Sequence, residues 1–118
     1  MSDRLFEVER VSFDVPEVTA LCEAQQEEMR GRYGGVADIG PTREAAMFVE
    51  PNGVFLVVRD DGERAIACGG ICRFDGARAE LKRMYVVPDA RGQGLGRRVL
   101  VALEEHARVL GYTGIGLE

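Results

Sequence analysis

One short segment constrains the fold of this chain more than any other, because it carries three glycines at alternate positions between a strand-like and a helix-like run. The segment is VVPDARGQGLGRR, from Val86 to Arg98. Glycine adopts left-handed backbone conformations readily and lets a ligand approach the main chain closely. The first N–H groups of a helix have no partner within it, and the helix dipole adds partial positive charge there. The pattern therefore predicts an anion site, such as one for a phosphate.

The charged residues are unevenly distributed around this segment. The chain has 118 residues and a formal net charge of −5, which argues against general nucleic-acid binding. Residues 82–98 nevertheless contain five basic residues and one acidic residue, whereas residues 1–81 contain nine basic and sixteen acidic residues. Positive charge is thus concentrated where an anion is expected, and the acidic remainder favours a cationic second ligand.

Length and composition predict one globular domain, residues 1–118, in the cytoplasm. Hydrophobic residues make up 46% and charged residues 30% of the chain, and no apolar run approaches the roughly 20 residues that a membrane span needs. Cys68 and Cys72 lie four apart in a strand-like run, about 13 Å, which is too far for a disulfide. With one histidine and no CxxC pair, no metal site is expected.

Hydrophobic periodicity and turn residues predict the element order β-α-α-β-β-β-α-β. Asp-Gly turns at residues 60–62 and 75–76 join three strands into an antiparallel meander, and the crossover through the glycine segment should make its two strands parallel. We therefore expect a mixed α+β fold, with a mostly antiparallel twisted sheet, helices on both faces and one parallel strand pair flanking the glycine loop. The predicted strands span 5–13, 54–59, 65–74, 78–87 and 114–117, and the predicted helices span 15–30, 42–49 and 95–110.

The glycines alone leave the phosphate ligand open. A nucleotide-binding P-loop is excluded, since no GxxxxGK[ST] pattern is present. A dinucleotide fingerprint needs GxGxxG directly after an apolar strand, with an acidic residue about 20 positions on. Here the spacing is GxGxG and the preceding strand, AELKRMYVV, is half charged, although Glu118 mimics the acidic residue. Dinucleotide binding therefore stays a less favoured alternative.

A third candidate comes from a family resemblance. The stretch LKRMYVVPDARGQGLGRRVLVALEEHARVLGY resembles the acetyl-CoA-binding core of the GNAT N-acetyltransferases, in which a strand ending in V-x-P leads into R/Q-x-x-G-x-G/A and a helix. The matching positions are Val86, Pro88, Arg91, Gly94 and Gly96. The resemblance implies a GNAT-like fold and acetyl-CoA as cosubstrate, without a metal. Because the family places a further helix with a tyrosine acid, and two strands, after the point where this chain ends, we expect a C-terminally truncated domain.

The resemblance also implies roles for individual residues. Backbone amides from Arg91 to Gly96 would hold the CoA pyrophosphate, and the main chain of residues 85–87 would bind the pantetheine arm like an added strand. The amide near Val86 would stabilise the thioester carbonyl. The predicted cofactor-binding residues are Tyr85, Val86, Val87, Arg91, Gly92, Gln93, Gly94, Leu95, Gly96 and Arg97.

Glu80 is the candidate general base. It lies on the strand leading to the glycine loop, six residues before Val86, so strict alternation places both side chains on one face. Family members often carry a carboxylate here that acts through water. Tyr33 and Asp38, in the loop at 32–41, are candidates for contacting the acceptor, although an ordinary solvated loop is an equal alternative.

These features predict an N-acetyltransferase that moves an acetyl group directly from acetyl-CoA to a primary amine of a small molecule or peptide. The alternative is a non-catalytic CoA-binding or regulatory module, since no residue of this chain matches the general acid. No nucleic-acid or membrane partner is expected, and a homodimer is left open.

Overall fold

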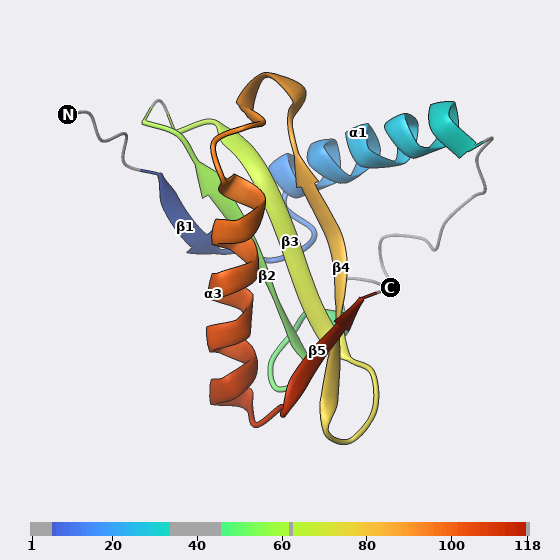
Figure 1. The fold of residues 1–118 in the computed structure, drawn as a ribbon, viewed down its shortest axis with the longest axis vertical. Helices are drawn as coiled ribbons and strands as arrows, with labels where there is room; N and C mark the ends of the chain where they lie inside the picture. Colours follow the sequence, from blue (N-terminus) through green and yellow to red (C-terminus); the bar gives the residue numbers. More distant parts are fainter. Residues whose placement is uncertain (1–5, 34–45, 62, 118) are drawn as a thin grey trace.

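The computed structural model describes residues 6–33, 46–61 and 63–117, which form a five-stranded sheet with helices on both faces (Figure 1). The strand order is β1-β2-β3-β4-β5, and neighbours are antiparallel except for β4 and β5, which are parallel. The predicted fold class, meander and parallel pair are confirmed. The elements are β1 Glu7–Arg10, α1 Pro16–Tyr33, β2 Gly53–Arg59, β3 Ala65–Arg73, β4 Arg78–Val86, the 3-10 turn η1 Pro88–Ala90, α3 Leu95–Leu110 and β5 Gly114–Leu117.

Most predicted element bounds agree with the structure to within a few residues. Helix α3 begins and ends as predicted because Gly94 and Gly111, both left-handed, flank it. The predicted first strand, 5–13, is too long. It ends at Arg10 because the chain then turns into α1, with the Ser12 hydroxyl donating to the Asp14 carboxylate at 2.6 Å. Half of the predicted helix at 42–49, residues 42–45, lies outside the described residues.

Two adjacent glycines in β3 allow close packing on both faces of the sheet. A Cβ atom on Gly69 would lie 2.9 Å from the Val99 side chain of α3. A Cβ atom on Gly70 would lie 2.6 Å from the rings of Phe48 and Phe55, on the opposite face. Real side chains do not approach this closely, so the glycine pair permits α3 and the aromatic cluster to reach the central strand from its two sides.

The cysteines lie in the core and none forms a disulfide. Cys68 is fully buried on β3, and its thiol lies 3.3 Å from the backbone carbonyl of Arg83. A hydrogen bond with the Cys22 thiol, together with burial, raises the pKa of Cys68 well above its ordinary value. This thiol therefore stays protonated at neutral pH and contributes to packing.

Neither a membrane span nor a metal cluster is found in the described ranges. No helix among these residues is long and apolar enough to cross a bilayer. The same residues contain no group of three or more His, Cys, Asp or Glu side chains arranged to hold a metal ion.

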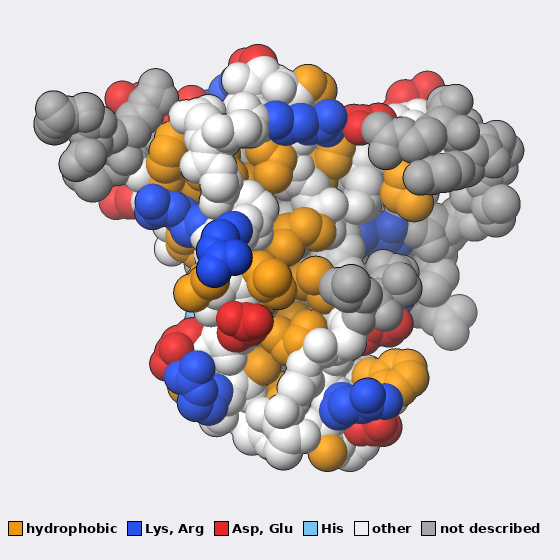
Figure 2. Space-filling model, viewed as in Figure 1, with side chains coloured by type: hydrophobic (Ala, Val, Ile, Leu, Met, Phe, Trp, Pro, Cys, Tyr) orange, Lys and Arg blue, Asp and Glu red, His pale blue; other side chains and the backbone are white. Residues whose placement is uncertain are grey.

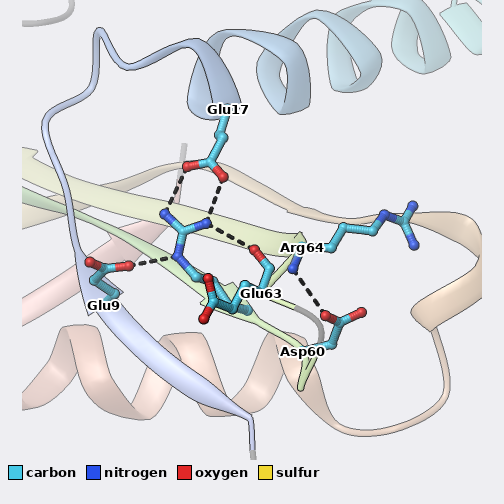
Figure 3. Close-up of polar contacts among 6 residues, drawn as sticks. Glu9, Glu17, Asp60, Glu63 and Arg64 are labelled. Atoms are coloured by element: carbon cyan, nitrogen blue, oxygen red, sulfur yellow. Dashed lines mark hydrogen bonds and ion pairs between the residues drawn. The ribbon is translucent and has the colours of Figure 1, made fainter.

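An arginine at the end of β2 connects three elements (Figure 3). The Arg59 guanidinium donates to both carboxylate oxygens of Glu17, at 2.6 and 2.7 Å, and to the Glu9 carboxylate at 2.6 Å. It also donates to the backbone carbonyl of Glu63 at 3.3 Å. Glu17 lies in the first turn of α1 and Glu9 on β1, so these bonds join the start of the helix to the edge of the sheet.

This arginine makes the stability of the fold depend on pH. The hydrogen bond from Arg59 holds the pKa of Glu17 below its ordinary value, so the stabilisation is complete above the unfolded pKa and disappears as the pH falls through the folded pKa. We expect Glu17→Gln to lower the Tm by roughly 2–5 °C at pH 7 in thermal unfolding followed by circular dichroism. The difference from wild type should shrink below about pH 4.3, the ordinary pKa of a glutamate.

Glu63→Gln is the matched control, since Glu63 contacts Arg59 through its main chain. The interpretation is wrong if the two variants lower the Tm equally at pH 7.

Candidate functional site

The glycine loop between β4 and α3 has the conformation that its sequence predicts. Gly92 and Gly94 have φ angles of +87° and +77°, in the region that side chains disfavour. A Cβ atom on either residue would meet nothing within 4 Å, so the space beside both is open. The glycines are therefore required by backbone conformation, and they leave the main chain accessible to a ligand.

A row of backbone amides is available at this loop. The first bond of α3 runs from the Arg98 amide to the Gly94 carbonyl at 3.0 Å, and no side chain caps the helix. Among the described residues, no amide from Gly92 to Arg97 donates to a backbone carbonyl. The Arg91 amide, in contrast, already donates to the Pro88 carbonyl at 3.3 Å, so the available row begins one residue later than expected. These amides and the helix dipole could together hold an anion, and we refer to the amides of residues 92–97 as the cradle.

The arginines near the cradle differ in what they contact. Arg97 is exposed and makes no ion pair or hydrogen bond with any residue the structure describes. Arg98 donates to the Phe6 carbonyl at 3.4 Å, and its guanidinium lies 5.7 Å from the Phe6 ring centroid. Arg91 reaches back to α1, where it pairs with Glu28 at 2.9 Å. Arg97 is thus the arginine best able to add charge at the cradle.

A β-bulge in β4 changes which residues share a face. Cys68 of β3 lies opposite Tyr85, whereas Gly70 lies opposite Lys82, so β4 carries one extra residue between these pairs. Arg83, within this bulge, has a φ of +60°, which is uncommon for a residue with a side chain. Bulges of this kind bend the strand and redirect the side chains that follow.

The bulge overturns one expectation about Glu80. Glu80 lies opposite Cys72 and Val86 opposite Ala67 on β3, and these two partners are five residues apart. Glu80 and Val86 therefore lie on opposite faces, and the prediction that they share one is wrong. Strict alternation fails because it assumes a regular ladder. The Glu80 side chain is 22% exposed, lies 3.7 Å from the Lys82 ammonium, and sits about 17–20 Å along the strand from Val86.

The end of β4 presents an open edge. The Val87 amide donates to the Ile66 carbonyl of β3 at 3.0 Å, so the preceding Val86 carbonyl is directed away from β3. On that side β5 pairs only with residues 78–81 of β4, among the residues described. The Val86 carbonyl instead accepts a bond from Arg91 Nε at 2.8 Å. An extended ligand could pair with the strand at this position.

Tyr85 is a packed strand residue rather than an exposed one. It is 9% exposed, its hydroxyl lies 3.3 Å from the Glu28 carboxylate, and the Arg91 guanidinium lies 5.5 Å from its ring centroid. Burial and the nearby negative charge of Glu28 raise the pKa of the Tyr85 hydroxyl, which therefore remains protonated at neutral pH.

A pocket of about 500 Å³ lies between α1 and β4, next to this edge. Gln25 donates to the Met84 carbonyl at 2.9 Å, while its Oε1 is buried without a partner among the described residues. The pocket residues from α1 were not identified from the sequence, although Gln25 interrupts an otherwise apolar helical stripe, which is a usable signal. Tyr33 has no described side chain and Asp38 lies outside the described residues. The pocket is lined by Gln25, Glu28, Met29, Met84, Tyr85, Val86 and Arg91.

The surface on the α3 side of the molecule combines apolar and charged areas. Hydrophobic side chains gather at its centre, and Lys, Arg, Asp and Glu side chains surround them (Figure 2).

Comparison with known proteins gives consistent matches. The model of the acetyltransferase (GNAT) family matches residues 18–118. An IAA acetyltransferase of Azospirillum brasilense is 41% identical over 70 residues, which cover 58% of this chain and 45% of that protein. An uncharacterized N-acetyltransferase of Escherichia coli is 30% identical over 101 residues, covering 77% of this chain and 60% of that protein. The chain thus spans about half the length of the curated relatives it matches.

The fold matches solved structures as well. A protein from Clostridium acetobutylicum, described as a predicted acetyltransferase and solved with acetyl-CoA, superposes with a TM-score of 0.73. The match covers 97% of this chain and 80% of that one at 17% identity, so it supports the fold alone.

The left-handed conformation of Gly94 should make the stability of the fold depend on this glycine. We expect Gly94→Ala to lower the free energy of unfolding by about 1–2 kcal/mol, because a Cβ atom disfavours this backbone conformation. The measurement is urea denaturation followed by circular dichroism. Gly76→Ala is the control, since a Cβ atom there is equally unobstructed and the φ of Gly76 is not positive. Equal effects of the two substitutions would contradict the assignment.

Proposed function

The chain belongs to the GNAT acetyltransferase family, and from this membership we propose that it transfers an acetyl group from acetyl-CoA directly to a primary amine. The observation that carries the proposal is the row of amides from Gly92 to Arg97 without backbone acceptors, at the start of α3 and beside the open edge of β4. We further propose that the acceptor is a small-molecule or peptide amine. A cytoplasmic location remains a prediction from the sequence.

The residues at the loop fit the phosphate part of acetyl-CoA. A pyrophosphate carries several anionic oxygens, and the amides from Gly92 to Gly96 supply donors, with open space beside Gly92 and Gly94. Arg97 adds a positive charge at the same end of the helix. The Clostridium protein solved with acetyl-CoA shares this fold.

The strand beside the loop fits the pantetheine part. This part of the molecule is an extended chain with two amide groups, which can bond to a strand edge as another strand does. The Val86 carbonyl is directed toward the open side of β4, whereas the Val87 amide is used within the sheet. We therefore assign the contact to the main chain around Val86, with Tyr85 and Val87 as its neighbours.

The chemistry requires a nucleophilic amine and an activated acyl group. Acetyl-CoA, when bound, supplies an acetyl thioester, and the transfer forms a C–N bond to the amine as the C–S bond breaks. The amine must first lose a proton to a base, and the thiolate that leaves must gain one. We propose Glu80 as the base, acting through a chain of several water molecules, because it lies about 17–20 Å along β4 from Val86. The Lys82 ammonium lies 3.7 Å from the Glu80 carboxylate.

A non-catalytic CoA-binding or regulatory module is the second candidate. It is favoured by the position of Glu80, which lies beside Lys82 and some distance along β4 from the glycine loop. The dinucleotide alternative has lost its support, since β4 lies between an antiparallel and a parallel neighbour rather than within a parallel sheet.

Acetyl-CoA titration and a thiol assay together test the proposal. We expect acetyl-CoA to bind in isothermal titration calorimetry and to release free thiol when primary amines are added. Gly94→Val should weaken acetyl-CoA binding at least tenfold, because its side chain enters the open space beside the cradle, whereas Gly76→Val should bind normally. Binding without thiol release across an amine panel would favour the non-catalytic module, and no binding at all would reject both candidates.

The role of Glu80 is tested separately by its pH dependence. Glu80→Gln should bind acetyl-CoA as wild type does, while its acetylation rate falls, most strongly below the pKa of the amine, where a base is needed. The measurement is the rate of thiol release against pH. Glu104→Gln, an exposed change on α3, is the control. A pH profile of Glu80→Gln that matches wild type would remove Glu80 from the mechanism.

A further inference from the structure

We propose that the pocket between α1 and β4 is the acceptor site, and that Glu28 selects a cationic amine by exchanging the Arg91 guanidinium for the ammonium group of the substrate. The inference rests on the proposed function, which it makes more specific. It also moves the acceptor site from the loop at 32–41 to the side chains of α1.

Glu28 is the anionic group in the pocket wall. Its carboxylate accepts two bonds from Arg91 Nη2, at 2.9 and 3.2 Å, and lies 3.3 Å from the Tyr85 hydroxyl. The Glu28 side chain is 29% exposed and that of Arg91 is 43% exposed, so a ligand can reach the ion pair. The carboxylate is therefore already held in position by donors from β4 and the glycine loop, as a preorganised cation site should be.

Arg91 links this carboxylate to the donor site. Its Nε atom bonds to the Val86 carbonyl at 2.8 Å, at the edge where the pantetheine arm is assigned. A ligand that pairs with β4 competes with Arg91 for this carbonyl. When Arg91 leaves this carbonyl, the contact of its Nη2 atom with both Glu28 oxygens is disturbed as well, because Nε and Nη2 belong to one rigid guanidinium. Binding of the donor should therefore make Glu28 more available to an incoming cation.

The rest of the pocket indicates what the amine carries. Met29 and Met84 supply flexible apolar walls that accept an alkyl or aryl stem. Gln25 is fixed by its bond to the Met84 carbonyl, and its buried Oε1 atom lacks a donor among the described residues. A second N–H group on the ligand would supply that donor. The pocket thus suits a primary ammonium on an apolar stem with a further N–H.

An anionic acceptor fits the same pocket less well. It would have to pair with Arg91 and leave Glu28 facing another negative charge. It would also lie close to the cradle assigned to the pyrophosphate, where like charges repel. A cation is attracted to both the Glu28 carboxylate and the donor phosphates, so the local charges favour the amine.

The test measures amine binding directly and needs no turnover. The probes are hexylamine, hexan-1-ol and hexanoate, which share an apolar chain and differ in charge, and binding is followed by ligand-observed NMR with and without CoA. Hexylamine should bind more tightly than the other two. Glu28→Gln should weaken hexylamine binding about tenfold or more, because a charge-assisted bond is lost, and should leave hexan-1-ol binding unchanged.

Two further variants keep the test specific. Without CoA, Arg91→Gln should strengthen hexylamine binding several-fold, because the competing internal cation is removed, whereas a variant that is merely misfolded would weaken it. Glu23→Gln removes the same charge from an exposed position of α1 that does not line the pocket, and should change nothing. CoA should strengthen hexylamine binding to wild type and should do so less in Arg91→Gln.

The inference is overturned if Glu28→Gln and Glu23→Gln affect hexylamine equally, if hexan-1-ol or hexanoate binds as tightly as hexylamine, or if Arg91→Gln weakens the amine. A parallel CoA titration separates this result from the proposed function. Normal CoA binding with a negative amine result rejects the acceptor site alone. Absent CoA binding rejects the proposed function, whatever the amine result.

Discussion

The β-bulge in β4 is the constraint on which the rest of the candidate site depends. The extra residue at Arg83 and Met84 inverts the alternation, so that Tyr85 meets Glu28 of α1 while Val86 is directed to the α3 side. In a regular strand these two positions would exchange faces, and the pocket would lose the tyrosine from its wall. The positive φ of Arg83 costs roughly 1 kcal/mol. The contact between the buried Cys68 thiol and the Arg83 carbonyl helps to hold this conformation.

The parts of the fold that local rules govern were predictable from the sequence. Helix α3 lies between Gly94 and Gly111, and its apolar stripe has one helical period, so both its bounds and its buried face follow from neighbouring residues. The bulge was not predictable in this way, because it appears only in the pairing of β4 with β3, between Cys68 and Gly70. When residues are counted along β4 past Arg83, strict alternation therefore assigns side chains to the wrong face, as it did for Glu80.

The candidate site, like the fold, was predictable only in part. The glycine loop follows from its own residues, whereas the acidic partner of Arg91 comes from α1, about sixty residues earlier in the chain. A count of basic residues suggests that Arg91 adds charge at the loop, but the structure pairs it with Glu28. The proposed anion cradle thus depends mainly on backbone amides, with Arg97 as the accessible charged side chain. Local charge counts overstate the field at a site when an acidic partner is distant in sequence.

A cradle made of main-chain amides also tolerates substitutions better than a pocket made of side chains does. Every residue except proline carries an N–H group, so most substitutions between Gly92 and Arg97 leave the donors in place, provided that the left-handed positions keep glycine. The α1 pocket has no such protection, because one codon change at Gln25 or Glu28 alters its chemistry. Substitutions during evolution can therefore change which ligand enters the α1 pocket, while the loop keeps the ligand that it binds.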